Sequence, residues 1–466
     1  MMEQLNAHLF PGDGDEHGAV IAASVVSTAY GTRLLASELY LAQDGVDYVN
    51  GQSGYKMLTA DFVQERVLDC ADKKLAYLAI HCHGRDGGRA SFSRTDIASH
   101  VRGYPALLDI LDGFPAGGVV FTEDAAAGDI WLPDGSRTEL GRVEITGRPI
   151  RRLYSKPSLS YDKPGDRYNR QAMLFGNRGQ KILEQQRIAV IGAGGAGSLI
   201  VEYLARLGVK DILVIDPDRI EPTNLPRVVG SLKRDTRPVL THNKLPLWFR
   251  RRAESLRVFK VAIAQRLARQ ADPTITFEPI PFDVLCPEVA QRLIDRDYIF
   301  LAADTMQVRL LFNALVHQYL VPGVQVGAKA QLNSRNGEII DLFSVVRPIV
   351  PGDGCLWCNG LILPAKLQEE AISSEEREKQ RYVDDEDVEA PSVITLNAVA
   401  AADAVNDYLM MVTGLLANEN HVRWSRYDPR QRTVVKEKPR QDYDCPECSS
   451  PKGRLGKGPQ RQLPTR

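Results

Sequence analysis

A glycine-rich run, IGAGGAGS, could bind a phosphate group. Gly192, Gly194 and Gly197 form the pattern G-x-G-x-x-G between an apolar segment and an amphipathic one. Glycine lets phosphate approach the backbone, and a following helix offers free N–H groups at the positive end of its dipole. Asp216 follows about 20 residues later, where a carboxylate can bind ribose hydroxyls. The run predicts a nucleotide site, and alone it favours an NAD- or FAD-dependent oxidoreductase.

Four of the seven cysteines form two C-x-x-C pairs, Cys355 with Cys358 and Cys445 with Cys448. In a reducing cytosol such pairs indicate metal binding before they indicate disulfides. Four thiolates suit tetrahedral Zn²⁺, and a site closed by four protein ligands leaves no room for substrate. The pairs therefore predict a structural zinc ion. Cys286, in FDVLCPEV, is expected to be a packed thiol.

Two histidines end an apolar strand, AYLAIHCHG. Side chains at i and i+2 of a strand share a face, so His81 and His83 can reach one metal ion. Asp96 follows in FSRTD. Two histidines, one aspartate and a water make an open zinc site of the hydrolytic type. The other interpretation is a pair of surface histidines, in which case this region would be a binding scaffold.

A hydrolytic zinc site also needs a carboxylate that takes a proton from the water. Glu38, in LLASELYLA, is the predicted residue, and Glu65 is the alternative. The order Glu, His-x-His, Ser-x-x-Asp over about residues 18–145 resembles the JAMM (JAB/MPN) metalloproteases, which include deubiquitinases. The resemblance implies that Ser93 stabilises the oxyanion. Gly84, where that family usually has proline, and the long Gly-rich stretch GRDGGRAS depart from its pattern.

Several polar motifs surround the glycine run in a fixed order. They are RYNRQ with Arg170, DPDRIEPTNLPR with Asn224 and Arg227, FKVAIAQRLARQADP with Lys260, and LAADTMQVRLLFN with Asp304. Together they resemble the ThiF/MoeB and ubiquitin-activating enzyme family from about Arg167 to Cys448. The resemblance implies ATP-dependent adenylation of the C-terminus of a ubiquitin-like or sulfur-carrier β-grasp protein.

The resemblance also implies a role for each motif residue. Asp216 would hold the ribose, and Asp304 would carry Mg²⁺. Arg170 would reach the phosphates of a neighbouring subunit in a homodimer. The phosphates of this subunit's own ATP would be held by Asn224, Arg227 and Lys260, and CLWC and CPEC match the structural zinc of the family.

The chemistry agrees with this resemblance. Adenylation places a carboxylate on the α-phosphate and expels pyrophosphate, so cations must neutralise the charge that builds in the transition state. Hydride transfer needs no such set. Thioester-forming relatives usually carry their nucleophilic cysteine between residues 359 and 444, and this sequence has none there. An enzyme that adenylates without forming a thioester is therefore expected, unless a conjugating partner supplies the cysteine.

The apolar patterns predict two domains. Residues 1–150 would form the α+β JAMM/MPN-like zinc isopeptidase domain, and 151–166 a linker rich in Pro, Ser and charge. Residues 167–450 would form an α/β adenylation domain with a Rossmann-like mixed, largely parallel sheet. A mobile loop is expected over 365–390, and a disordered tail over 451–466.

Composition excludes some classes of protein. The chain has 466 residues, 44% apolar and 25% charged, with a formal net charge of −1. A nearly neutral chain has no global field that would draw it to nucleic acid or a membrane surface. No apolar run approaches the ~18 residues of a transmembrane helix, and the N-terminus lacks the pattern of a secretory signal. A cytoplasmic enzyme is expected.

Three functions remain open. A hydrolase fused to an adenylase implies conjugation and removal of a ubiquitin-like protein, by analogy in bacteria and in phage defence. Activation and trimming of a sulfur carrier for cofactor or amino-acid biosynthesis is the first alternative. A non-catalytic adaptor that binds ubiquitin-like proteins is the second. The expected cofactors are ATP, Mg²⁺ and two zinc ions, one catalytic and one structural.

Overall fold

The computed structural model divides into two units, each with its own core. It describes residues 1–466 except 50–55, 85–87, 158–160, 164, 241–244, 334–335, 372–390, 417–422 and 451. The first unit is Met1–Ser160 with Arg454–Gln462, and the second is Tyr161–Gly453 with Leu463–Arg466. The division after Ser160 falls inside the segment predicted to be a linker.

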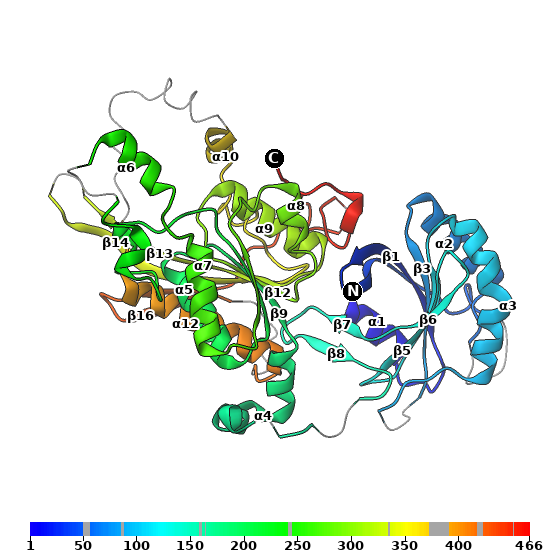
Figure 1. Ribbon diagram of the computed structural model, residues 1–466. Coiled ribbons are helices and arrows are strands. Elements are labelled where there is room, and N and C mark those ends of the chain that lie inside the picture. Colours follow the sequence, from blue (N-terminus) through cyan, green and yellow to red (C-terminus); the bar gives the residue numbers. More distant parts are fainter. Residues whose placement is uncertain are drawn as a thin grey trace. The chain divides into compact units, whose positions relative to one another are not determined.

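The first unit is built on a six-stranded sheet with the order β2-β1-β3-β4-β5-β6 (Figure 1). In this sheet β3 and β4 run parallel, and every other pair of neighbouring strands runs antiparallel. The elements of the unit are α1 Met2–Leu9, β1 Gly18–Thr28, β2 Gly31–Leu41, α2 Ala60–Asp72, β3 Ala76–Cys82, α3 Arg94–Leu111, β4 Ala116–Phe121, β5 Ala126–Trp131, β6 Arg137–Glu139, β7 Val143–Ile145, β8 Arg151–Leu153 and the 3₁₀ turn η4 Gly458–Gln460.

The first part of strand β1, residues 18–23, is apolar and buried because both of its faces are covered. Its residues alternate between the two faces, as side chains in a strand must. Ala19 and Ile21 pack on one face in a core that includes Leu5 and Leu9 of α1. Val20 and Ala22 pack on the other face, in a core that includes side chains of α2 and α3.

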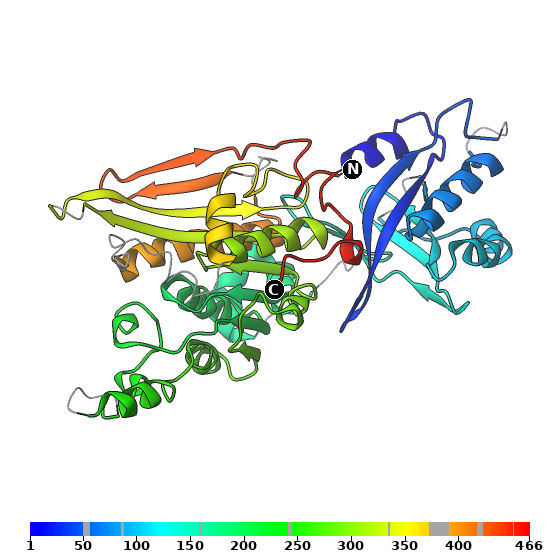
Figure 2. The same cartoon turned by 90° about the horizontal axis from the view of Figure 1, so that it is seen from above.

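The second unit contains an eight-stranded sheet with the order β11-β10-β9-β12-β13-β14-β15-β16. Strands β11 to β13 run parallel, and β13 to β16 form an antiparallel ribbon (Figure 2). Its strands are β9 Arg187–Ile191, β10 Asp211–Ile215, β11 Thr276–Ile280, β12 Tyr298–Leu301, β13 Gly323–Leu332, β14 Ile339–Ile349, β15 Trp424–Asp428 and β16 Thr433–Glu437. The predicted mixed α/β class with a Rossmann-like parallel sheet is confirmed for this unit.

The helices of the second unit follow the strand–helix alternation expected of parallel sheets. They are α4 Asn169–Glu184, α5 Gly195–Leu207, α6 Leu247–Glu254, α7 Lys260–Ala271, α8 Pro287–Gln291, α9 Met306–Gln318, α10 Pro364–Ala371 and α12 Ile394–Thr413, with the short 3₁₀ turns η1 Asp166–Tyr168, η2 Pro222–Asn224 and η3 Lys233–Thr236. Most of the loop predicted over 365–390 lies outside the described residues, and its first part belongs to α10.

The prediction of a disordered C-terminal tail is wrong for residues 452–466. The turn η4 packs against β1, and the Ser37 hydroxyl donates to the Gly456 carbonyl over 2.7 Å. Gly456 has a φ of +68°, and a Cβ there would lie 2.7 Å from the carbonyl oxygen of Ala36. The composition suggested a segment without a core, but its glycines let the backbone pack closely against the sheet.

Candidate functional site

The glycine turn joins β9 to α5 through close backbone packing. Gly192 has a φ of +94°, a conformation that favours glycine, and its N–H donates to the Ile215 carbonyl over 2.8 Å. A Cβ on Gly197 would lie 1.8 Å from the Gly192 carbonyl oxygen, so this position needs glycine for packing. Gly194, the N-cap of α5, is different, because a Cβ there would meet no atom within 4 Å. Its open space adjoins the helix N-terminus, where a phosphate would approach.

Asp216 follows β10 and holds the glycine turn. Its carboxylate accepts the N–H of Ala193 over 2.7 Å and that of Asp218 over 2.8 Å. The residue is only 6% exposed. Burial raises the pKa of Asp216, while the charge of Lys260 and the two backbone donors oppose this shift. The predicted ribose ligand therefore also fixes the backbone that would surround the phosphates.

Two adjoining cavities meet at Pro217 and Asp218, which line both. The first, of about 350 Å³, is lined by Gly192, Asp216 and Asp304 among others. The second, of about 620 Å³, is lined by the predicted phosphate ligands Asn224, Arg227 and Lys260. The structure thus brings together two predicted site residues, Gly192 and Asp304, that lie 112 positions apart.

The second cavity holds more cations than the sequence motifs indicated. Arg219 and Arg257 line it beside Arg227 and Lys260. The Lys260 ammonium contacts the Asp218 carboxylate over 2.6 Å. Arg219 stands inside the recognised motif DPDRIEP, so it could have been proposed. Arg257 lies between α6 and α7, outside the motifs, and only the fold places it at the cavity.

Arg170 is not among the residues that line these two cavities. It is exposed in the first turn of α4 and lines neither cavity. The sequence assigned it to the phosphates of a neighbouring subunit, which a single chain does not test, so its role stays a prediction.

The four paired cysteines converge on one point. Sulfur–sulfur distances are 3.6 Å for Cys355–Cys358, 3.7 Å for Cys355–Cys445 and 3.5 Å for Cys358–Cys448. Four thiolates at about 2.3 Å from a tetrahedral zinc ion would lie about 3.8 Å apart. The donor set and its spacing therefore fit a zinc ion closed off from substrate.

A second cluster of metal-ligand type lies in the first unit. The Nε2 atoms of His81 and His83 lie 3.2 Å apart, and Asp96 Oδ2 lies 3.7 Å and 3.5 Å from them. Ligands at about 2.0–2.1 Å from a tetrahedral ion would be separated by about 3.3 Å. Burial alone would raise the pKa of Asp96, but hydrogen bonds with His81, His83 and Ser93 bring it well below its usual range. The predicted ligand set is assembled, and all three side chains are partly exposed.

Ser93 has a structural role that the motif did not reveal. It is the N-cap of α3: its hydroxyl accepts the Asp96 N–H over 3.2 Å, and Asp96 Oδ2 accepts the Ser93 N–H over 2.7 Å. This reciprocal capping box orients Asp96 toward the histidines. The spacing Ser-x-x-Asp is thus also what a helix start requires.

The prediction of Glu38 as the acid beside the histidines is wrong. Its carboxylate contacts Lys73 over 2.7 Å and the Tyr40 hydroxyl over 2.5 Å. In the sheet Glu38 aligns through Ala22 with Tyr77, four residues before His81. Four residues of strand are about 13 Å, too far for a shared water. The alternative, Glu65, is paired with Arg66 on α2.

The structure places Glu16 at the histidines instead. Gly18, the first residue of β1, pairs with His81, and the antiparallel chain direction brings the preceding segment, with Glu16, toward His83. Glu16 Oε1 lies 4.0 Å from His83 Nε2. Burial raises the pKa of Glu16, and the histidines oppose that shift. Sequence reasoning missed this residue because only strand register brings it there.

Comparison with known proteins finds a family match for the region around the glycine turn. Residues 168–237, from the end of η1 through the glycine turn to η3, match the ThiF family. The family match extends over this segment of the chain. We call the unit that contains it the ThiF-like unit.

Curated relatives agree with that match. The chain is 27% identical over 195 residues to the SAMP-activating enzyme E1 of Haloferax volcanii, covering 41% of this chain and 61% of that protein. It is 26% identical over 219 residues to the sulfur carrier protein ThiS adenylyltransferase of Bacillus subtilis, covering 43% of this chain and 56% of that protein. The chain thus spans between half and two thirds of the length of each. The solved structure of Escherichia coli MccB with AMPCPP and MccA matches with a TM-score of 0.45 at 17% identity. The match covers 62% of this chain and 75% of that chain.

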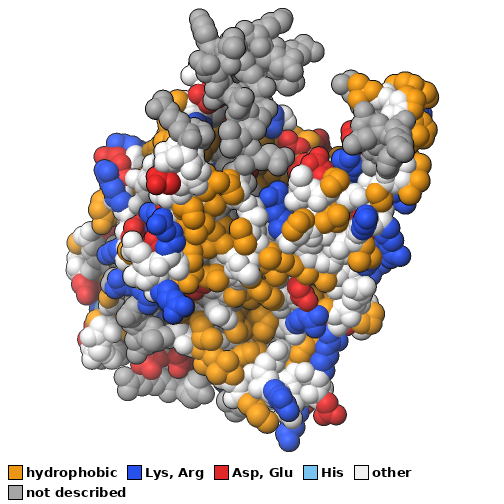
Figure 3. Space-filling model, turned by 90° about the vertical axis from the view of Figure 1, so that its left-hand side faces the viewer, with side chains coloured by type: hydrophobic (Ala, Val, Ile, Leu, Met, Phe, Trp, Pro, Cys, Tyr) orange, Lys and Arg blue, Asp and Glu red, His pale blue; other side chains and the backbone are white. Residues whose placement is uncertain are grey.

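Exposed apolar side chains gather on the antiparallel half of the ThiF-like unit. Helix α12 packs on β13 and β14, and β16 extends the same sheet through β15. Large apolar residues that stay exposed on these elements are Leu332, Ile339, Ile340, Ile394, Val399, Val434 and Val435, together with Val393 at the N-cap of α12. Figure 3 shows a face of the molecule where hydrophobic side chains gather broadly. Exposed apolar patches of this kind mark interaction surfaces.

None of the helices in the described part of the chain combines the length and the apolar character that a membrane crossing requires.

Proposed function

We propose that the ThiF-like unit adenylates the C-terminal carboxylate of a ubiquitin-like or sulfur-carrier β-grasp protein with ATP. The observation that carries this proposal is the pair of adjoining cavities, one bordered by the glycine turn, Asp216 and Asp304, the other by four cations. The adenosine and a Mg²⁺ ion on Asp304 would occupy the first cavity, and the phosphates would extend from the glycine turn into the second.

The cation set suits this reaction. Attack of the carboxylate on the α-phosphate breaks the bond to pyrophosphate, and negative charge grows on the leaving group. Arg227, Lys260 and the neighbouring arginines would neutralise that charge from fixed positions. A Mg²⁺ ion carried by Asp304 would supply further neutralisation. The ion pair with Asp218 holds Lys260 at the rim of the cavity.

ATP–pyrophosphate exchange with a panel of β-grasp carriers tests the proposal. Lys260→Ala, Arg227→Ala and Asp304→Ala should each lower exchange by about 10²-fold or more. Arg269→Ala is the matched control, because Arg269 is an exposed cation on the same helix as Lys260. No exchange with any carrier would favour the non-catalytic adaptor. Exchange that is unchanged in the Asp304 variant would contradict the role of Asp304 as the Mg²⁺ ligand.

The exposed apolar face of α12 and β13 to β16 is the proposed docking surface for the carrier. The sequence has no cysteine between residues 359 and 444, which favours adenylation without a thioester on this chain. Sulfur-carrier activation is then the simplest outcome of the reaction. Conjugation of a ubiquitin-like protein would need a separate conjugating enzyme, and a purified system with and without such an enzyme separates the two.

A homodimer is proposed on the basis of Arg170. If this arginine reaches the phosphates of a neighbouring subunit, Arg170→Ala and Lys260→Ala proteins should each be inactive alone. Mixing them would restore part of the exchange activity, because some mixed dimers contain one intact site. Mixtures that remain inactive at concentrations where the protein is dimeric would contradict the shared site.

A second activity, zinc-dependent hydrolysis after the carrier's tail, is proposed for the first unit. His81, His83 and Asp96 would hold the ion, which lowers the pKa of a bound water to about 7 when present. Glu16, at 4.0 Å from His83, would take the proton of the attacking water and pass it to the leaving amine. The assembled ligand set with a carboxylate beside it supports this reaction class.

The hydrolase is tested with carriers extended beyond their C-terminal glycine. Glu16→Gln should lower kcat by about 10²–10⁴-fold without removing zinc. Glu38→Gln, which changes a glutamate of the same unit that lies away from the histidines, should leave kcat unchanged. The reverse ranking would restore the sequence-based assignment of Glu38.

A further inference from the structure

Glu16 stands in an irregular segment between α1 and β1, so something other than a helix or strand must hold its position. The residues on both sides of it are anchored. The Asp13 carboxylate accepts the Asp15 N–H over 3.1 Å and contacts His17 Nε2 over 2.9 Å. His17 is 3% exposed, and the Cys82 thiol donates to the Leu9 carbonyl over 3.0 Å.

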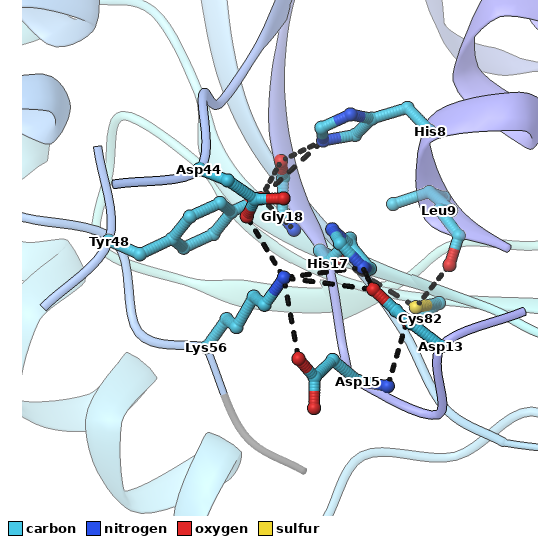
Figure 4. A network of polar contacts seen from close by, with 10 residues as sticks. All are labelled: His8, Leu9, Asp13, Asp15, His17, Gly18, Asp44, Tyr48, Lys56 and Cys82. Carbon is cyan, nitrogen blue, oxygen red and sulfur yellow. Dashed lines mark hydrogen bonds and ion pairs between the residues drawn. The ribbon is translucent and has the colours of Figure 1, made fainter. Parts of the chain in front are cut away.

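The side chain of Lys56 lies close to all three of these flanking residues, Asp13, Asp15 and His17 (Figure 4). The Lys56 ammonium lies 3.4 Å from Asp15, 3.9 Å from Asp13 and 3.5 Å from His17 Nε2. It also contacts Asp44, in the loop after β2, over 2.9 Å. Three carboxylates from two separate segments therefore converge on a single cation, which is only 20% exposed at its side chain. Without that cation the three carboxylates would repel one another.

Met57 and Leu58, the two residues after Lys56, pair with residues that follow β2. Tyr48 pairs with Leu58 in an antiparallel bridge, and the N–H of Val49 donates to the Met57 carbonyl over 2.8 Å. The Tyr48 hydroxyl accepts the Gly18 N–H over 3.0 Å, at the first residue of β1. The backbone next to Lys56 is thus held by hydrogen bonds to the residues after β2.

We propose that Lys56 is a positioning residue for the hydrolase, which holds Glu16 at His83 by clasping Asp13, Asp15 and His17 on either side of it. The inference rests on the proposed hydrolytic function of this unit. Lys56 contacts neither the predicted metal ligands nor Glu16 in the structure, so it acts through the backbone segment. A carboxylate that must reach a water within hydrogen-bond distance is sensitive to displacements of about 1 Å, which can cost 10²-fold in rate.

Lys56→Met and Lys56→Arg test the clasp, with Lys73→Met as the matched control. Lys73 also bridges two carboxylates of the first unit, Glu38 and Asp69, but away from the histidines. Hydrogen exchange measured by mass spectrometry on peptides that cover 11–17 reports the clasp without any need for activity. We expect Lys56→Met to speed exchange there by about 10-fold or more, and Lys73→Met to leave it unchanged.

The kinetic arm uses β-grasp carriers extended beyond their terminal glycine. Lys56→Met should lower kcat by about 10- to 100-fold with KM and zinc content within about 2-fold of wild type. Lys56→Arg should restore most of kcat because it keeps the cation. Equal losses of kcat in Lys56→Met and Lys73→Met, or no rescue by arginine, would overturn the positioning role.

The two readouts separate this inference from the hydrolase itself. Unchanged exchange over 11–17 in Lys56→Met overturns the clasp whatever the enzyme cleaves. Faster exchange there together with a fully active Glu16→Gln protein overturns the catalytic role of Glu16, and with it the catalytic purpose of the clasp.

Discussion

The glycine turn allows fold and nucleotide binding to be separated with two single-methyl changes. Gly197 and Gly194 stand three residues apart in one motif, yet their surroundings differ. A Cβ on Gly197 would lie 1.8 Å from the Gly192 carbonyl oxygen, so turn and helix would have to separate by roughly 1.2 Å to reach even the 3.0 Å that real Cβ atoms keep. The two nearest atoms are the carbonyl oxygen and carbon of Gly192, which are backbone and cannot rotate away as a side chain could. We expect Gly197→Ala to lower the free energy of unfolding by about 3 kcal/mol or more.

Gly194→Ala should behave in the opposite way. Its backbone, with φ −77° and ψ −151°, is extended, and a Cβ there meets nothing within 4 Å. Loss of the glycine N-cap costs at most about 1 kcal/mol. The added methyl would, however, occupy the space where phosphate approaches the helix N-terminus, and we expect ATP affinity to fall at least about 10-fold, or 1.4 kcal/mol.

Denaturant unfolding and calorimetric titration with ATP measure the two quantities on the same proteins. The expected pattern is a stable Gly194→Ala protein that binds ATP poorly and a Gly197→Ala protein with a clearly lower midpoint. If Gly194→Ala bound ATP as wild type does, the phosphates would not lie over this turn. If Gly197→Ala were as stable as wild type, the close backbone approach would not exist.

Three further outcomes follow from the structure. Metal analysis should find about two zinc ions per chain, with one lost in His81→Ala and one in Cys445→Ser, and only the second loss should lower Tm strongly, because a closed four-thiolate site supports folding. Burial lowers the pKa of His317 to about 3. Since its pKa in the unfolded chain is about 6.5, the unfolded state gains a proton below that pH and the folded protein loses stability, about 2 kcal/mol by pH 5. The pH dependence of denaturant unfolding should therefore weaken in His317→Leu. Gly456→Ala, at a φ of +68° and against the Ala36 carbonyl, should lower stability by about 1–3 kcal/mol, and an unchanged midpoint would show that the C-terminal segment does not pack on the sheet.

The sequence predicted the parts of the site whose chemistry is local. The glycine turn, the two C-x-x-C pairs and His81-x-His83 each specify their geometry within a few residues, because turn, helix start and strand periodicity are local properties. The α/β class of the second unit followed from its strand–turn–helix–strand pattern. Both metal-type clusters were also predicted residue by residue, since cysteine and histidine at such spacing are typical of metal ligands.

Register and packing decided what the sequence could not. Glu38 and Glu16 are both acids near apolar strands, and only the pairing of Gly18 with His81 selects Glu16. Arg257 reaches the second cavity, and Gly456 reaches the sheet, through contacts between segments far apart in the chain. Strand pairing and loop closure depend on which distant residues lie opposite each other, and a local pattern holds no information on that choice. The sequence by itself determined the chemical groups this protein can use, and the tertiary structure decided which of them face one another.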